Sequence, residues 1–265
     1  MLKKLYKYEF YSLFRSLVPI YAAILGFAAL SRLTMLVEIE NSIFNIIKGF
    51  MTAFYVFAVL AVFIVGLVVV VMRFYKNLLS HEGYLTFTLP FTPTQHIVCK
   101  LLCGVVVMIV SFVMVIASLM ILAAGTGIIT QIFEFIEKAF ASAALYYSKA
   151  QLAGTAALFV LLMLVSLFQS LLMFYASIAI GQQFKSKAGG AVVAYICLYA
   201  ASQVVSTVLI AVAALVLASA GSDFQFSTIG AFQAYIGFLT VFCAAFAAAY
   251  FFIARYFLTK KLNLE

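Results

Sequence analysis

Six long apolar stretches constrain the fold of this chain more than any other feature of its sequence. They cover about residues 17–37, 50–72, 97–124, 153–181, 190–220 and 232–254. Each is near or above the roughly 20 residues that a helix needs to cross the hydrocarbon core of a bilayer. Because 67% of all residues are hydrophobic and only 9% are charged, a soluble domain is excluded. We expect an all-α integral membrane protein with six transmembrane helices.

The spans are predicted to be helices because their apolar character has no two-residue period. Strands of a membrane barrel alternate polar and apolar residues over about 10 positions, whereas Val59–Val71 has no polar residue at all. A helix also satisfies its own backbone hydrogen bonds in lipid. We expect residues 1–265 to form a single transmembrane domain.

Lysine and arginine predict the orientation, since positively charged loops are retained in the cytoplasm. Twelve of the 16 fall on one side together with three acids, and four fall on the other side with five acids, which gives net charges of +9 and −1. Both termini are therefore expected in the cytoplasm. The formal net charge of +8 follows from this topology and from attraction to anionic lipid heads, so it gives no reason to expect nucleic acid as a partner.

The segment 1–16 is expected to form an amphipathic helix in the inner membrane interface. Leu5, Phe10 and Leu13 share one helical face, and Lys4 and Lys7 lie on another. Pro19 would then permit a change of direction into the first span. The alternative is a cleaved signal peptide, because the apolar run 17–30 has the length of a signal core.

Motifs for catalysis and metal binding are absent from the sequence. The phosphate-binding pattern G-x-x-x-x-G-K-[ST] does not occur. His81-Glu82 begins like a zinc-protease helix, but Leu85 stands where that motif needs its second histidine. The spans also hold almost no ionisable residue at mid-depth, which ion-coupled carriers usually need. We expect no enzyme, no metal site and no cofactor in this chain.

The polar segment 73–96, between the second and third stretches, is expected to form a compact cytoplasmic structure. Residues 73–82 suit a helix, and Gly83 can take the left-handed conformation that ends one. Thr92, Pro93 and Gln95 form a strong helix start, with Thr92 as N-cap and Gln95 closing a capping box. The alternative is an ordinary loop with interfacial aromatic residues.

This segment resembles a known family. The run from Tyr75 to Pro90, followed by Lys100-Leu-Leu, is similar to the cytoplasmic coupling region of bacterial ABC exporter permeases of the type-two class (ABCG-like, type V). The layout is also similar: a basic amphipathic N-terminal helix, six spans, and no nucleotide-binding domain in the chain. The resemblance implies a permease subunit in the bacterial cytoplasmic membrane, with a coupling helix that docks on a separate ATPase subunit carrying ATP and Mg²⁺.

The resemblance implies eight residues in docking; Glu82, Gly83 and Tyr84 match the centre of the family's motif, and Tyr75, Asn77 and Leu85 match its flanks, as does Pro90. The eight are Tyr75, Asn77, His81, Glu82, Gly83, Tyr84, Leu85 and Phe87. Glu82 would meet a basic or amide group of the ATPase, and Tyr84 with Phe87 would fill an apolar groove. His81 departs from the family, in which an acid or a neutral polar residue is more usual. A second copy or a paralogue would complete the transport pathway.

Two polar helical faces and a pair of aromatic residues are candidates for that pathway. They are Phe54 and Phe57 in the second span, Gln169 and Ser170 in the fourth, and Tyr195, Tyr199, Ser202 and Ser206 in the fifth. A pathway lined by aromatic rings and hydroxyls without fixed charge would favour an amphipathic or apolar substrate such as a peptide, drug or lipid. The alternative is that small polar residues and aromatics only pack neighbouring helices together.

The segment 126–152 is an amphipathic candidate on the outer side. Ile129, Ile132, Phe133, Ile136 and Phe140 oppose Glu134, Glu137 and Lys138, so this segment could lie on the outer leaflet or cap the exit of the pathway. For the whole chain, the alternative to an exporter subunit is a passive channel or a structural membrane subunit without an ATPase.

Overall fold

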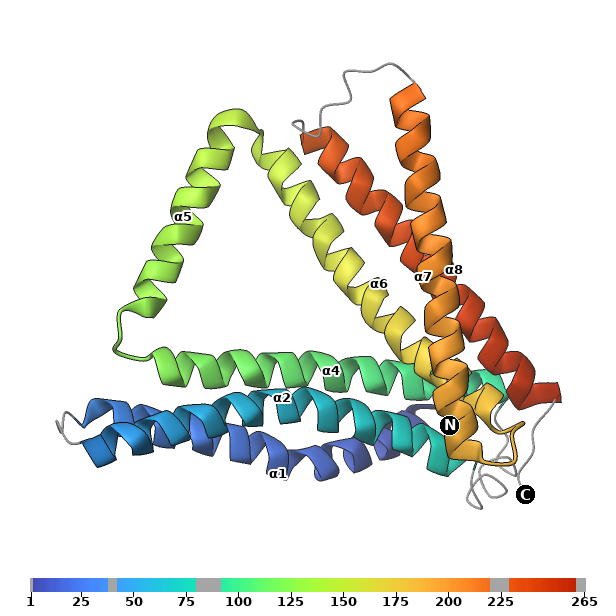
Figure 1. The fold of residues 1–265 in the computed structure, drawn as a ribbon, viewed down its shortest axis with the longest axis horizontal. Coiled ribbons are helices and arrows are strands. Elements are labelled where there is room, and N and C mark those ends of the chain that lie inside the picture. Colours follow the sequence, from blue (N-terminus) through green and yellow to red (C-terminus); the bar gives the residue numbers. More distant parts are fainter. Residues whose placement is uncertain (1, 38–41, 80–91, 220–228, 261–265) are drawn as a thin grey trace. The chain divides into compact units, whose positions relative to one another are not determined.

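The computed structural model describes residues 2–37, 42–79, 92–219 and 229–260. Seven helices make up nearly all of these residues: α1 (Leu2–Leu36), α2 (Ser42–Leu79), α4 (Pro93–Ala123), α5 (Ile128–Tyr146), α6 (Lys149–Gly181), α7 (Lys187–Ser219) and α8 (Ile229–Lys260) (Figure 1). All except α5 are long and apolar enough to cross a membrane. The chain is thus a multi-pass membrane protein, and the six predicted spans are confirmed as helices.

The helices extend beyond the apolar stretches from which they were predicted. α2 begins eight residues before the stretch 50–72 and ends seven residues after it. α1 runs without interruption from Leu2 to Leu36 with Pro19 inside it, so the segment 1–16 is not a separate helix. Its position in the membrane interface stays a prediction.

The described residues group into two compact units, and each is considered by itself. Unit 1 comprises residues 1–73 and 98–142, and unit 2 comprises residues 74–97 and 143–265. The expectation of a single transmembrane domain stays a prediction.

Unit 1 is built on α1, α2 and α4, which run alongside one another (Figure 1). A buried stripe recurs every three or four residues along α1, at Leu13, Leu17, Tyr21, Ile24 and Ala28, as expected for one face of a helix. Hydroxyl pairs link this bundle internally: Tyr21 with Ser111 at 2.8 Å and Tyr55 with Ser118 at 3.0 Å. Such pairs join neighbouring helices where lipid offers no hydrogen-bond partner.

Unit 2 is built on α6, which packs against both α7 and α8. The helix begins at Ser148 with a capping box closed by Gln151, and Gln233 of α8 donates to the carbonyl of Gln151 at 2.9 Å. At the other end, the turn between α6 and α7 is tight because Gly181 lies against the backbone of Ala191, where a Cβ would collide. Glycine is therefore required at this crossing.

Candidate functional site

A buried charge cluster joins the three helices of unit 1. One carboxylate oxygen of Glu9 on α1 accepts from Nζ of Lys100 on α4 at 2.8 Å and from Nε of Arg73 on α2 at 2.9 Å. Arg73 also donates to the hydroxyl of Ser12. The side chains of Glu9 and Lys100 are only 9% and 6% exposed, and charges are that deeply buried only when they are paired.

The cluster lies on both helices that bound the predicted docking segment. Arg73 is near the end of α2, and Lys100 is about two turns into α4. Glu9 therefore fixes α1 to the helix that enters the segment 73–96 and to the helix that leaves it. The sequence contained a signal for this cluster: Glu9 is the first acid of the chain, and no other occurs before Glu38.

The predicted helix start after the docking segment is confirmed. Pro93 is the first residue of α4, the backbone N–H of Thr92 donates to Gln95 Oε1 at 2.9 Å, and the backbone N–H of Gln95 donates back to Thr92 Oγ1 at 3.4 Å. These two bonds make the reciprocal capping box that the residue types predict.

Most of the predicted docking residues lie outside the described residues. These are His81, Glu82, Gly83, Tyr84, Leu85 and Phe87, and their proposed role stays a prediction. Tyr75 and Asn77 are described, and both are half-buried on the last two turns of α2.

An aromatic contact ties the base of the docking segment to α6 within unit 2. Phe74 of α2 stacks on Tyr175 of α6 with 4.0 Å between ring centroids and 6° between their planes, and both are fully buried. The preceding residue of α6, Phe174, stacks on Tyr195 of α7 at 4.7 Å, and Tyr195 stacks on Tyr199 at 6.4 Å. A series of aromatic contacts thus runs from α2 through α6 to the polar face of α7.

The predicted pathway residues of unit 2 are brought together only in part. Tyr195 and Tyr199 are in contact. Ser202 and Ser206 donate to carbonyls of their own helix at 2.7 and 2.8 Å, and Ser170 does the same at 2.9 Å. Hydroxyls bonded in this way keep lone pairs with which they can accept a further hydrogen bond. Gln169 is half-buried on α6.

The two phenylalanines predicted for the pathway belong to unit 1. Phe54 of α2 stacks on Phe27 of α1 at 6.5 Å, and more than half of its surface remains exposed. Phe57 is exposed as well. The contact of Phe54 favours the packing interpretation for that residue.

Tyr250 of α8 was missed by the sequence reasoning. Its side chain is 3% exposed, and its hydroxyl has no hydrogen-bond partner among the described residues, although Tyr195 and Ser202 of α7 belong to its polar surroundings. A buried hydroxyl without a partner is costly. Nothing local distinguishes this tyrosine in the sequence, because α8 carries aromatic residues on all sides.

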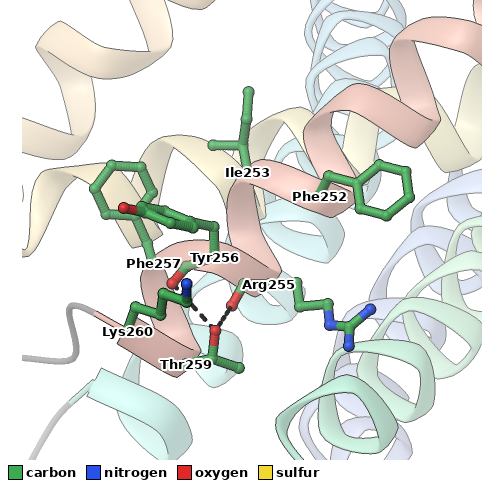
Figure 2. A pocket seen from close by; sticks show the side chains of 7 residues that line it. All are labelled: Phe252, Ile253, Arg255, Tyr256, Phe257, Thr259 and Lys260. Carbon is green, nitrogen blue, oxygen red and sulfur yellow. Dashed lines mark hydrogen bonds between the residues drawn. The ribbon is translucent and has the colours of Figure 1, made fainter.

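The end of α8 carries a shallow hollow of a different kind. Figure 2 shows that its side chains leave the helix in several directions, with Arg255 pointing away from Tyr256 and Lys260. Lys260 lies over the ring of Tyr256 at 5.8 Å. Basic and aromatic residues at the end of a span are typical of the membrane interface, and these do not converge on a common point.

Within the described ranges, no group of three or more His, Cys, Asp or Glu could hold a metal ion. Comparisons with known proteins give no relative: no family model, no curated protein and no solved structure matches this chain.

Proposed function

We propose that this chain is the transmembrane subunit of an ATP-driven exporter. It would work by alternating access with a separate ATPase subunit, which holds ATP and Mg²⁺, and with a second copy of itself or a paralogue. The proposal includes the bacterial cytoplasmic membrane as its location, with both termini in the cytoplasm. It rests on the resemblance of the segment 73–96 to exporter coupling regions and on the contacts described above.

The observation that carries the proposal is the aromatic series in unit 2. A subunit driven by an ATPase needs a rigid connection between the docking segment and the helices that line the pathway. Phe74 lies at the base of the docking segment, and its stack on Tyr175 continues through Phe174 to Tyr195 and Tyr199. Phe74 and Tyr175 are fully buried, and close-packed side chains of that kind transmit displacement because the interior has little free volume; the series becomes more exposed towards Tyr199. A passive channel has no need of such a connection.

The charge cluster gives the docking segment a second anchor. Glu9 holds Arg73 and Lys100, so a force on the segment between them would also reach α1. Rotation of packed helices about such fixed points is one of the common modes of switching between states.

The substrate that fits this account is amphipathic or apolar. Tyr195, Tyr199, Ser202 and Ser206 on α7 offer rings and hydroxyls without a fixed charge, and Tyr250 adds a buried hydroxyl. Rings would stack on apolar parts of a peptide, drug or lipid, and the hydroxyls would hydrogen-bond its polar parts.

Two substitutions, measured in the same labelling assay, distinguish docking of the ATPase from transmission of its motion to α7. A cysteine placed at Ser206, which is half-buried on the same face of α7 as Tyr195, Tyr199 and Ser202, reports on the pathway face when the four native cysteines are replaced by serine. In membranes that contain the partner ATPase, its rate of labelling should change when ATP, Mg²⁺ and vanadate are added. Glu82→Ala should abolish the change by releasing the ATPase, whereas Tyr175→Ala should abolish it with the ATPase still bound.

The control is Tyr146→Ala, which removes an exposed tyrosine of α5 and should leave the ATP response intact. An ATP response that persists in Tyr175→Ala would contradict the proposed connection. If no ATPase purifies with the unmodified chain, the exporter proposal is wrong and a passive channel or structural subunit is favoured.

A further inference from the structure

A second site lies in unit 1, in the corner where α5 leaves α4 (Figure 1). The corner encloses a half-open cavity of about 490 Å³, which is within the usual size of ligand pockets. One wall comes from the last two turns of α4, including Leu119 and Met120; a second comes from α5, including Ile132 and Phe133; and Met35 of α1 closes the end. All lining residues belong to unit 1.

The lining is almost entirely apolar. Of the twelve residues around the cavity, Thr126 is the one with a polar side chain, and its hydroxyl already donates to the carbonyl of Ala123 at 2.8 Å. The predicted apolar face of α5 accounts for this, since Ile129, Ile132, Phe133 and Ile136 all line the cavity. No residue of α5 is buried by the protein itself. The cavity therefore suits an aliphatic chain and offers nothing to a polar molecule.

A cation stands beside the cavity. Arg32 of α1 is one turn before Met35, and its Nη2 lies 2.9 Å from the position that a Cβ would take at Gly125, next to Thr126. Gly125 has a φ of +74°, so glycine is favoured there by its backbone as well as by the arginine. The described residues provide no ion-pair partner for Arg32, which is half-buried.

We propose that this corner binds an anionic membrane lipid. An acyl chain occupies the cavity between α4 and α5, and the phosphate of the headgroup pairs with Arg32. Charge complementarity identifies the headgroup, since guanidinium binds phosphate by paired hydrogen bonds. The location favours a lipid, and not a free phosphate, as the source of the phosphate group, because the cavity lies at the ends of helices long and apolar enough to cross the membrane. The site does not depend on the exporter proposal or on an ATPase.

The test is a titration of the purified full-length chain, followed by native mass spectrometry. The probes are dioleoylphosphatidylglycerol and dioleoylphosphatidylcholine, which share their acyl chains and differ in net charge. The unmodified protein should bind the anionic lipid about tenfold more tightly, as one charge-assisted pair provides. Arg32→Gln should abolish this preference, and Arg32→Lys should keep part of it.

Two further variants distinguish binding of the acyl chain in the cavity from pairing of the headgroup with Arg32. Ile132→Trp fills the cavity and should weaken binding of both lipids, whereas Lys48→Gln is the matched control for charge. Lys48 is another cation on the same predicted side, and it lies over the ring of Phe44 at 5.0 Å. The proposal is overturned if Arg32→Gln keeps the preference, if Lys48→Gln lowers it equally, or if Ile132→Trp binds both lipids as before.

Discussion

Replacing Glu9 by glutamine should destabilise unit 1 far more than the loss of a surface charge would. The substitution keeps the size of the side chain and removes only its charge. Two unit charges 2.8 Å apart, the distance between Glu9 and Lys100, attract each other by about 6 kcal/mol at an effective dielectric constant of about 20. Part of this offsets the cost of burying the ions. Removing one partner of a buried pair typically costs about 3–5 kcal/mol, because the other charge stays buried.

A thermal unfolding experiment in detergent can measure this cost. The chain has no tryptophan, but Cys99 and Cys103 are buried beside Lys100 and become reactive towards a thiol dye on unfolding. With Cys197 and Cys243 replaced by serine, dye labelling during heating gives an apparent Tm. A loss of about 3–5 kcal/mol corresponds to a decrease of about 6–20 °C for a chain of this size.

Two controls make the result specific to the cluster. Glu134→Gln breaks the exposed pair with Lys138, 3.4 Å apart on α5, and should change stability by less than about 0.5 kcal/mol. The double variant Glu9→Gln/Lys100→Gln should recover much of the loss, because the more deeply buried cation is then removed, while Arg73 is 25% exposed and keeps its hydrogen bond to Ser12. Equal decreases in Tm for Glu9→Gln and Glu134→Gln, or a double variant no more stable than Glu9→Gln alone, would show that the buried pair does not stabilise unit 1.

Gly181→Val should lower stability by about 1–3 kcal/mol or more, since its Cβ collides with the backbone of Ala191; thermal unfolding checks this against Gly26→Val, where nothing lies within 4 Å of the added atom. For topology, a cysteine at Ser148 should react with a membrane-impermeant thiol reagent in intact cells, and one at Ser186 should react only after permeabilisation. The reverse pattern would invert the predicted orientation.

Local sequence patterns predicted the helices and their starts because the physics behind them is local. A span is set by its own run of apolar residues, and the capping box at Thr92 needs only Gln95 three residues on. The full lengths were underestimated, since α2 continues beyond its apolar stretch. Hydropathy reports the bilayer thickness and not the point at which a helix ends.

The contacts between helices could not be predicted in the same way. Glu9 is 64 residues from Arg73 and 91 from Lys100, and Phe74 is about a hundred residues from Tyr175. In a membrane helix most faces are apolar, so periodicity does not tell which face meets another helix and which meets lipid. The pattern is clearest on α5, where Ile129, Ile132 and Phe133 line the cavity beside α4 and the charged residues lie opposite them, while the position of α5 on the outer leaflet stays a prediction.

Docking of the segment 73–96 on an ATPase can be tested by site-specific photo-crosslinking in living cells. The substitution Tyr84→p-benzoylphenylalanine places the crosslinker in the docking segment, and Tyr146→p-benzoylphenylalanine places it on α5 as a matched control. The probe at position 84, and not the one at position 146, should capture a protein that carries the G-x-x-x-x-G-K-[ST] motif. Docking on an ATPase is contradicted if position 84 captures no such protein, or if both positions capture it equally.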